Sequence, residues 1–197
     1  MMLKNKLSAY KIILASASPR RKKLLEQMEL DFEIRLKPVE EVYPDTLKGA
    51  QISDYLSQLK AKPFQESVRQ NEIVITSDTV VWHRDKSLAK AASAQEAREM
   101  LQNLSGDWHD VITSVCFTMR QNQQTKHKIT RVKFKELGAE EIDHYVTNYR
   151  PFDKAGAYGI QEWIGLIAIE EIRGCYTNVV GLPTQLVYET LTAIADQ

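Results

Sequence analysis

The order of apolar and polar positions predicts a chain of alternating strands and helices. An apolar run makes Lys11–Ser16 a buried strand, and Leu24, Leu25 and Met28, which recur at helical spacing, place a helix over Pro19–Met28. The same patterns predict helices between Asp45 and Lys62, from Ser93 to about Leu104, over Ala139–Tyr149 and from Leu182-Pro183 onward, and strands over Glu72–Val81, Val111–Met119, Lys128–Phe134 and Trp163–Arg173. Helices between strands indicate an α/β fold, and a hairpin formed by two neighbouring strands makes its sheet mixed.

Length and composition narrow the class of protein. With 197 residues, of which 43% are hydrophobic, the chain can bury a substantial core, and we expect a single domain over residues 1–197. The 26 Lys and Arg side chains balance 26 Asp and Glu side chains, so no net field attracts nucleic acid or a membrane surface. No segment approaches the ~18 apolar residues of a membrane span. Two cysteines without a repeated spacing form no disulfide framework or zinc motif, so we expect a protein of the reducing cytoplasm.

The second strand of the predicted hairpin is basic and raises the question of nucleic-acid binding. Its charged positions are Lys126, His127, Lys128, Arg131, Lys133 and Lys135. They lack interleaved aromatic side chains, and the chain has no positive net charge. We therefore favour a solvated strand that protects a sheet edge over an RNA-binding surface, and we expect no nucleic-acid partner.

The turn that begins at Ser16, with the sequence Ser-Ala-Ser-Pro-Arg-Arg, lies where the first strand meets the first helix. Ser18 can cap this helix, and Pro19 suits its first turn, where no backbone donor is needed. Free N–H groups, the helix dipole, two hydroxyls and the guanidiniums of Arg20 and Arg21 then favour an anion, with phosphate as the natural ligand. The alternative is an ordinary capped surface helix whose arginines are solvated.

Two acidic positions are candidates for catalysis. Asp78 ends a buried strand, where α/β sheets usually present ligand-facing groups and where a carboxylate can hold a divalent metal or orient water. Glu40 and Glu41, on the loop before the second helix, can join Asp78 around Mg²⁺, a cation that prefers oxygen ligands. The alternatives are a strand-end cap at Asp78 and a solvated pair at Glu40-Glu41.

The loop Asp153–Gln161 is unusual for a simple connection. It begins with an Asp-Lys pair, contains small residues that allow close backbone approach, and ends in an amide that can hydrogen-bond the edge of a base. The four histidines of the chain show no ligand spacing, which argues against a zinc site.

Together these motifs resemble the Maf-like nucleoside triphosphate pyrophosphatases over nearly the whole chain. In the family's order they are Ser16–Arg21 followed by Leu24-Leu25, Ser77-Asp78-Thr79-Val80-Val81, Leu104-Ser105-Gly106, Asp153–Gln161 and Val180-Gly181-Leu182-Pro183. The resemblance implies a mixed sheet flanked by helices in the two-lobed Maf and inosine-triphosphatase-like architecture. It also implies hydrolysis of the α–β phosphoanhydride of a nucleoside triphosphate to monophosphate and pyrophosphate, with a divalent metal (Mg²⁺, Mn²⁺ or Co²⁺), by a homodimer.

The resemblance also assigns roles to individual residues. Asp78 is expected to be the catalytic carboxylate and, with Glu41, to bind the metal. Lys60 and Lys90 are expected to complete the charge clamp around the phosphates, and the two serines of the first turn, Ser16 and Ser18, become phosphate donors rather than nucleophiles. Lys90 is followed by alanine where the family usually has proline, which predicts a less rigid loop there.

Three positions mark substrate preference within the family, and here they are Arg20, Thr79 and Gln161. This set is similar to the branch that acts on dTTP and UTP. The branch that prefers 7-methylated GTP has an acidic residue in place of the glutamine, as suits a cationic base, whereas an amide both donates to and accepts from a uracil-like edge. Two alternatives stay open: a 7-methyl-GTP pyrophosphatase, or a nucleotide-binding regulator of cell division that has lost turnover.

Overall fold

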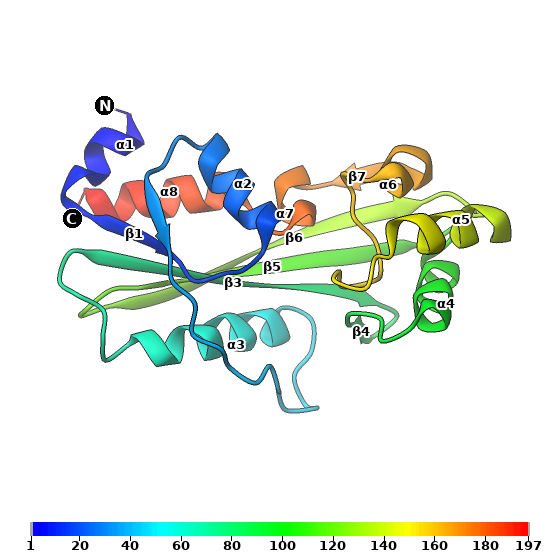
Figure 1. Cartoon of the computed structure of the whole chain (residues 1–197), viewed down its shortest axis with the longest axis horizontal. Helices are drawn as coiled ribbons and strands as arrows, with labels where there is room; N and C mark the ends of the chain where they lie inside the picture. The colour runs from blue at the N-terminus through cyan, green and yellow to red at the C-terminus, as the bar shows by residue number, and fades with distance from the viewer. Residues whose placement is uncertain (1, 197) are drawn as a thin grey trace.

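The computed structural model describes residues 2–196, and within this range the chain forms a seven-stranded sheet with helices on both faces (Figure 1). The strands are β1 (Lys11–Leu14), β2 (Phe32–Ile34), β3 (Glu72–His83), β4 (Lys86–Leu88), β5 (Trp108–Thr118), β6 (Gln123–Phe134) and β7 (Ile169–Arg173). The α-helices are α1 (Leu3–Lys6), α2 (Pro19–Gln27), α3 (Ala50–Ala61), α4 (Ala94–Leu104), α5 (Ala139–Tyr149), α6 (Trp163–Ala168), α7 (Tyr176–Val180) and α8 (Thr184–Ala195), with 3₁₀ turns at Leu7–Ala9 and Lys62–Phe64.

The sheet is mixed, as the sequence predicts. Its order is β2-β1-β3-β5-β6-β7. The short strand β4 pairs with the end of β3, on the same edge of β3 that β1 occupies further back. The pairs of β1 with β2 and β3 are parallel, and the remaining pairs are antiparallel. The long strands β3, β5 and β6 run the length of the molecule, so they connect its two ends (Figure 1).

Two large apolar clusters divide the core between those ends. One cluster joins α1, α2 and α8 to β1 and the first part of β3, with Leu14, Ile75 and Leu191 among its buried members. The other joins α4, α5 and α6 to the opposite ends of β5 and β6, with Leu101 and Phe134 fully buried. On the other face of the sheet, α3 packs against β3 and β5 (Figure 1). The long strands therefore support two lobes, and the space between the lobes lies over the middle of β3.

The segment Trp163–Arg173 is a helix followed by a strand, so the expectation of one continuous strand is wrong for its first half. Ile164 and Ala168 are fully buried while Leu166 between them is 82% exposed, which is the four-residue spacing of a helix rather than the alternation of a strand. The second half forms β7, which pairs with Arg131–Phe134. The basic strand β6 is therefore covered by β7 over part of its length, and only its remaining part lies at the sheet edge.

A tight hairpin after β3 was not foreseen from the sequence. Arg84 and Asp85 connect β3 to β4, and both have positive φ angles, of 47° and 61°. Two residues with positive φ are the geometry of a type I′ turn, which glycine, asparagine and aspartate favour. Asp85 is of this kind, but Arg84 is not and no glycine marks the turn, so the sequence carries only a weak signal for it.

No helix in residues 2–196 combines the length and the apolar character that a membrane crossing requires.

Candidate active site

A large cavity opens at a gap in the sheet. The edge of β3 pairs with β1 only as far as Ile75, and pairing with β4 begins at Val81. Within the described residues, Thr76–Val80 therefore pairs with β5 on one edge and with no strand on the edge that β1 and β4 occupy. A cavity of about 990 Å³ opens at this gap, and it is lined by the turn after β1, by β3, by α3 and by the loop Asp153–Gln161. This volume suits a sizeable small-molecule ligand.

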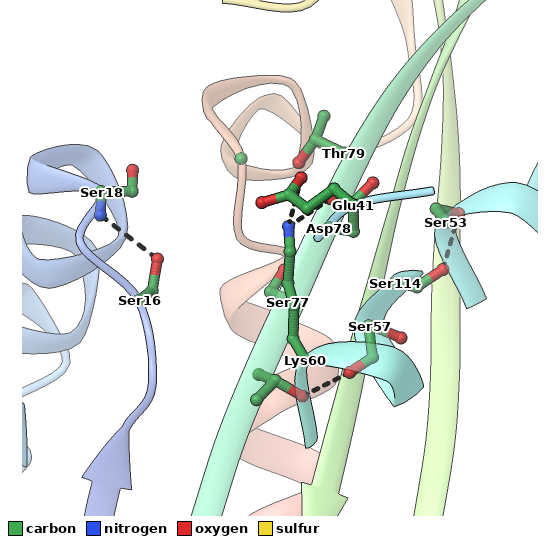
Figure 2. A network of polar contacts seen from close by, with 12 residues as sticks. Ser16, Ser18, Glu41, Ser53, Ser57, Lys60, Ser77, Asp78, Thr79 and Ser114 are labelled. Carbon is green, nitrogen blue, oxygen red and sulfur yellow. Dashed lines mark hydrogen bonds and ion pairs between the residues drawn. The ribbon is translucent and has the colours of Figure 1, made fainter. Parts of the chain in front are cut away.

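The turn between β1 and α2 forms one wall of the cavity. Ser18 caps α2 as predicted, because its Oγ accepts a hydrogen bond from the Arg21 backbone N–H, and Pro19 occupies the first turn. Oγ of Ser16 accepts a hydrogen bond from the Ser18 backbone N–H at 3.2 Å (Figure 2). The cavity is thus lined by the positive end of the α2 dipole and by two hydroxyls, which favours an anionic ligand group.

The two arginines of the turn have different surroundings. Arg20 forms an ion pair with Asp153 at 2.8 Å, which joins the turn to the opposite lobe. Arg21 lies deeper, where its guanidinium donates to the carbonyls of Ser77 and Gly181, to Thr79 Oγ1 and to Ser16 Oγ. Burial lowers the pKa of Arg21, and the nearby Asp78 carboxylate opposes that shift. Because most of its N–H groups already have protein partners, Arg21 chiefly holds the turn against β3 and α7.

Lys60 connects the two acidic positions. Its ammonium lies 2.6 Å from Asp78 Oδ1 and 3.0 Å from Glu41 Oε2, so the strand, the loop before α3 and α3 itself meet at one cation (Figure 2). Asp78 is 7% exposed, whereas Glu41 is exposed at the cavity wall. Of the two neighbouring glutamates, Glu41 is the one that lines the cavity.

Buried hydroxyls fix α3 on the sheet and thereby place Lys60. Thr76 Oγ1 donates to the carbonyl of Ser57 at 2.7 Å. Ser114 Oγ donates to Ser53 Oγ at 2.7 Å (Figure 2). Lys60 follows Ser57 by three residues, so it lies on the same side of the helix and reaches the next inward position of β3. Small polar residues in α3 allow this close approach of helix and strand.

The loop Asp153–Gln161 and the segment before Ala91 close the cavity from the second lobe. Gly156 and Ala157 have positive φ angles, and the Gly156 N–H donates to the carbonyl of Leu88 at 3.0 Å. Lys90 forms an isolated bridge with Ala155, so its backbone is held although no proline follows it. Lys90 and Gln161 are both exposed and both line the cavity.

Thr79 lies between the two lobes at the centre of the gap. Its Oγ1 accepts from Arg21 at 3.2 Å and lies 3.0 Å from Thr113 Oγ1, which in turn donates to the carbonyl of Asn178. Thr79 therefore holds its place by bonds within the protein while remaining at the cavity surface.

The structure brings all the predicted site residues to one cavity. Its lining includes Ser16, Ser18, Arg20, Arg21, Glu41, Lys60, Asp78, Thr79, Lys90 and Gln161. The contacts behind the loop have no counterpart in the sequence pattern: Lys154 is buried, and it pairs with Glu162, whose carboxylate accepts a hydrogen bond from Tyr145. A lysine that directly follows Asp153 was visible as a potential ion pair, but the partners on α5 and before α6 come from distant parts of the sequence.

The acidic residues of the cavity provide oxygen donors for a cation without forming a closed cage. Asp78 and Glu41 face the same ammonium, and within residues 2–196 no group of three or more His, Cys, Asp or Glu side chains is arranged to hold a metal. Mg²⁺ commonly binds through one or two carboxylates together with waters and substrate phosphates. This pair of carboxylates therefore fits a cation that binds together with an anionic ligand.

Comparisons with known proteins show the family of the chain. A family model described as Maf-like protein matches residues 11–194. A dTTP/UTP pyrophosphatase of Flavobacterium johnsoniae is 52% identical over 193 residues, covering 98% of this chain and 100% of the relative. A dTTP/UTP pyrophosphatase of Bacteroides fragilis is 48% identical over 191 residues, covering 96% and 98%. Among solved structures, the Staphylococcus aureus Ham1 protein has a TM-score of 0.50 at 14% identity, covering 93% of this chain and 99% of that chain, which is a likeness of fold.

Proposed function

The chain belongs to the Maf-like protein family, and on this premise we propose that it hydrolyses the α–β phosphoanhydride of dTTP and UTP. The products are the nucleoside monophosphate and pyrophosphate. The names of the full-length relatives support this substrate class. The observation that carries the proposal is the Lys60 ammonium between Asp78 and Glu41, placed in a large cavity opposite the N-terminus of α2.

The proposed reaction needs a positioned water and fixed positive charge. Asp78 accepts a proton from water as the water oxygen attacks the α-phosphorus. The bond between the α-phosphorus and the bridging oxygen breaks, and pyrophosphate leaves with the electron pair. Lys60 holds the Asp78 carboxylate in place, and Lys90, Ser16 and Ser18 face the phosphates, because charge that develops on phosphoryl oxygens is stabilised by preorganised donors.

A divalent metal fits this site through Asp78 and Glu41. The two carboxylates would supply oxygen donors to Mg²⁺, Mn²⁺ or Co²⁺, cations that bind through one or two carboxylates together with substrate phosphates. Such a metal would supply charge neutralisation at the phosphates. Lys60 pairs with both carboxylates and holds them with respect to each other.

The proposal extends to the cellular location, the oligomeric state and the absence of a nucleic-acid partner. We propose that the protein acts in the cytoplasm, which the two free cysteines, Cys116 and Cys175, support because structural disulfides are rare there. We propose that it forms a homodimer, as the family resemblance implies, which light scattering after size exclusion can measure. We propose no nucleic-acid partner, since Lys133 donates to the carbonyl of Gly106 and Arg131 pairs with Asp110.

The test measures pyrophosphate release from a panel of nucleotides with Mg²⁺ or Mn²⁺, with the monophosphate identified as the other product. The panel contains dTTP, UTP, CTP, their 5-methylated forms, GTP and 7-methyl-GTP. We expect release from dTTP and UTP, and its loss in Asp78→Asn with nucleotide binding retained. A preference for 7-methyl-GTP contradicts the substrate, unchanged turnover in Asp78→Asn contradicts the role of this carboxylate, and binding without turnover indicates the regulatory alternative.

A further inference from the structure

A chain of alternating charges connects α2 to α5. Arg20 Nη1 lies 2.8 Å from one oxygen of Asp153, and the other oxygen of Asp153 lies 2.7 Å from the Lys154 ammonium. That ammonium also lies 2.9 Å from Glu162, whose second oxygen accepts a hydrogen bond from the hydroxyl of Tyr145. Two positive and two negative groups thus form one network that is neutral as a whole.

The two ends of this network belong to different lobes. Arg20 lies in the first turn of α2, and Leu25 of the same helix is buried in the apolar cluster around β1. Asp153 begins the loop whose Tyr158 is buried in the apolar cluster of the second lobe. The ion pair between Arg20 and Asp153 therefore spans the space between the lobes.

The part of the network that lies in the second lobe is held in place by burial and pairing. Lys154 is 8% exposed, and Tyr145 is fully buried. A buried ammonium is tolerated only when it is paired, and Glu162 supplies a partner. The hydroxyl of Tyr145 also accepts a hydrogen bond from the N–H of Gly159 at 3.0 Å. Lys154 is thus a fixed cation behind Asp153.

The carboxylate of Asp153 has a different cation at each of its two oxygens. Rotation of the carboxylate would break a charge-assisted hydrogen bond to Lys154 or to Arg20. The side chain of Asp153 is nevertheless 58% exposed, and exposed ion pairs contribute little to stability. The main consequence of this arrangement is therefore the geometry that it gives to Arg20.

Arg20 keeps most of its donors for a ligand. Within residues 2–196 its side chain makes one hydrogen bond, to Asp153, whereas all three nitrogens of the Arg21 guanidinium donate to protein acceptors. A guanidinium has five N–H donors in a planar fork, so the remaining donors of Arg20 are available at the cavity wall beside Ser16 and Ser18. A long side chain loses rotamer freedom when a ligand orders it, and a partner that restrains it beforehand reduces that loss.

We propose that Asp153 is a positioning residue that holds Arg20 ready to bind the nucleotide. This inference rests on the proposed function, because the nucleotide is the substrate of that reaction. Asp153 acts through Arg20, since an anion that faced a polyanionic substrate alone would oppose binding.

The test measures binding of the non-hydrolysable α,β-imido analogue of dUTP by calorimetry, in the presence of Mg²⁺. Asp153→Asn keeps the size and removes the charge, and we expect it to weaken binding about five- to tenfold, the effect of one misplaced hydrogen-bonding group. The removal of a negative charge from the cavity would by itself tighten binding, so a loss reports the position of Arg20. Asp143→Asn is the matched control, because Asp143 pairs with Arg98 at 2.6 Å with similar exposure but lies outside the cavity.

A double-mutant cycle with Arg20→Ala separates positioning from a general structural effect. If Asp153 acts through Arg20, Asp153→Asn should no longer weaken binding when Arg20 is already alanine. Steady-state turnover of dTTP gives a second measurement. Asp153→Asn should raise KM by a factor similar to that in binding and leave kcat within about twofold, because a contact made equally in the ground state and the transition state changes KM alone.

Tighter or unchanged binding in Asp153→Asn overturns the inference, as does an equal loss in the Arg20→Ala background or a fall in kcat at unchanged KM. Turnover of dTTP by the wild type with no such coupling refutes the inference alone. Coupling in the binding of the analogue without turnover of dTTP refutes the proposed function alone. A wild type that neither binds the analogue nor turns over dTTP refutes both.

Discussion

Lys60 Nζ lies 2.6 Å from Oδ1 of Asp78, at the point where β3 has lost its β1 neighbour and α3 ends. The contact joins the strand to the helix inside the cavity, and Glu41 approaches the same ammonium from the loop before α3. Both carboxylates therefore share one ion-pair partner, which fixes their position with respect to each other.

Replacing Lys60 by methionine should lower kcat/KM for dTTP by about 10²- to 10³-fold, because the substitution removes a preorganised cation and leaves Asp78 and Glu41 without a shared partner. Steady-state pyrophosphate release measures this effect. Lys62→Met, which changes an exposed lysine outside the cavity, is the control and should retain activity. Near-normal turnover in Lys60→Met would exclude Lys60 from the reaction.

Replacing Gln161 by glutamate should reduce activity on dTTP and UTP relative to 7-methyl-GTP by about tenfold or more, because a carboxylate cannot donate to the O4 oxygen of uracil and favours a cationic base. The measurement is the ratio of kcat/KM values for UTP and 7-methyl-GTP. Gln27→Glu, an exposed change at the end of α2, controls for added charge. An unaltered ratio contradicts the base-reading role.

Two glycines near the loop should respond differently to alanine. A Cβ atom on Gly165 would lie 1.8 Å from the carbonyl oxygen of Ile160, which is backbone and cannot move aside. We expect Gly165→Ala to lower the free energy of unfolding by about 3 kcal/mol or more. Gly159→Ala meets only the ends of side chains, so its loss should be smaller. Urea denaturation decides, and equal losses would contradict the structure of this loop.

Asp85→Gly should stabilise the protein. Asp85 has a φ of 61° in the two-residue turn between β3 and β4. This conformation costs an L-residue about 1–2 kcal/mol of folding free energy, a cost that glycine avoids. Glycine also makes the unfolded chain more flexible, which cancels about 0.5–1 kcal/mol of that gain. We expect a net gain of about 0.5–1 kcal/mol and a rise in Tm of about 2 °C. Asp85→Ala removes the same carboxylate without relieving the backbone, and it should give no such gain. Thermal unfolding of both variants measures the difference.

His109 should make stability depend on pH. Burial lowers the pKa of His109 to about 3, against 6.5 for an unperturbed histidine. The folded state therefore binds fewer protons than the unfolded state between these values, so stability falls as pH falls through this window, by about 1.4 kcal/mol per pH unit.

The variant His109→Phe should accordingly lose about 2 kcal/mol less than the wild type between pH 7 and pH 5. Urea denaturation at both pH values measures this difference. His109→Gln, which also cannot titrate, should show the same reduced dependence, whatever its stability at pH 7. A pH dependence equal to that of the wild type in both variants would show that His109 is not the responsible group.

The sequence was most informative where a signal is local. Ser18 and Pro19 predicted the start of α2, and the helix Ala139–Tyr149 was predicted within its observed bounds, because caps and helical spacing act within one or two turns. The resemblance identified the family, and the residues it selected line one cavity. The first half of Trp163–Arg173 was assigned wrongly, since a short apolar run does not by itself distinguish a buried helix from a strand.

The sequence by itself determined the mixed α/β class, the capped turn before α2 and the identity of the acidic and basic side chains, because these depend on neighbouring residues and on the chemistry of each side chain. Only the tertiary structure decided that Arg21 is used to hold the turn, that Lys60 stands between Asp78 and Glu41, and that Tyr145 reaches Glu162 behind the loop. These contacts join segments far apart in the chain. Their distances follow from the ending of β1, the packing of α3 and the approach of the two lobes, which no local pattern encodes.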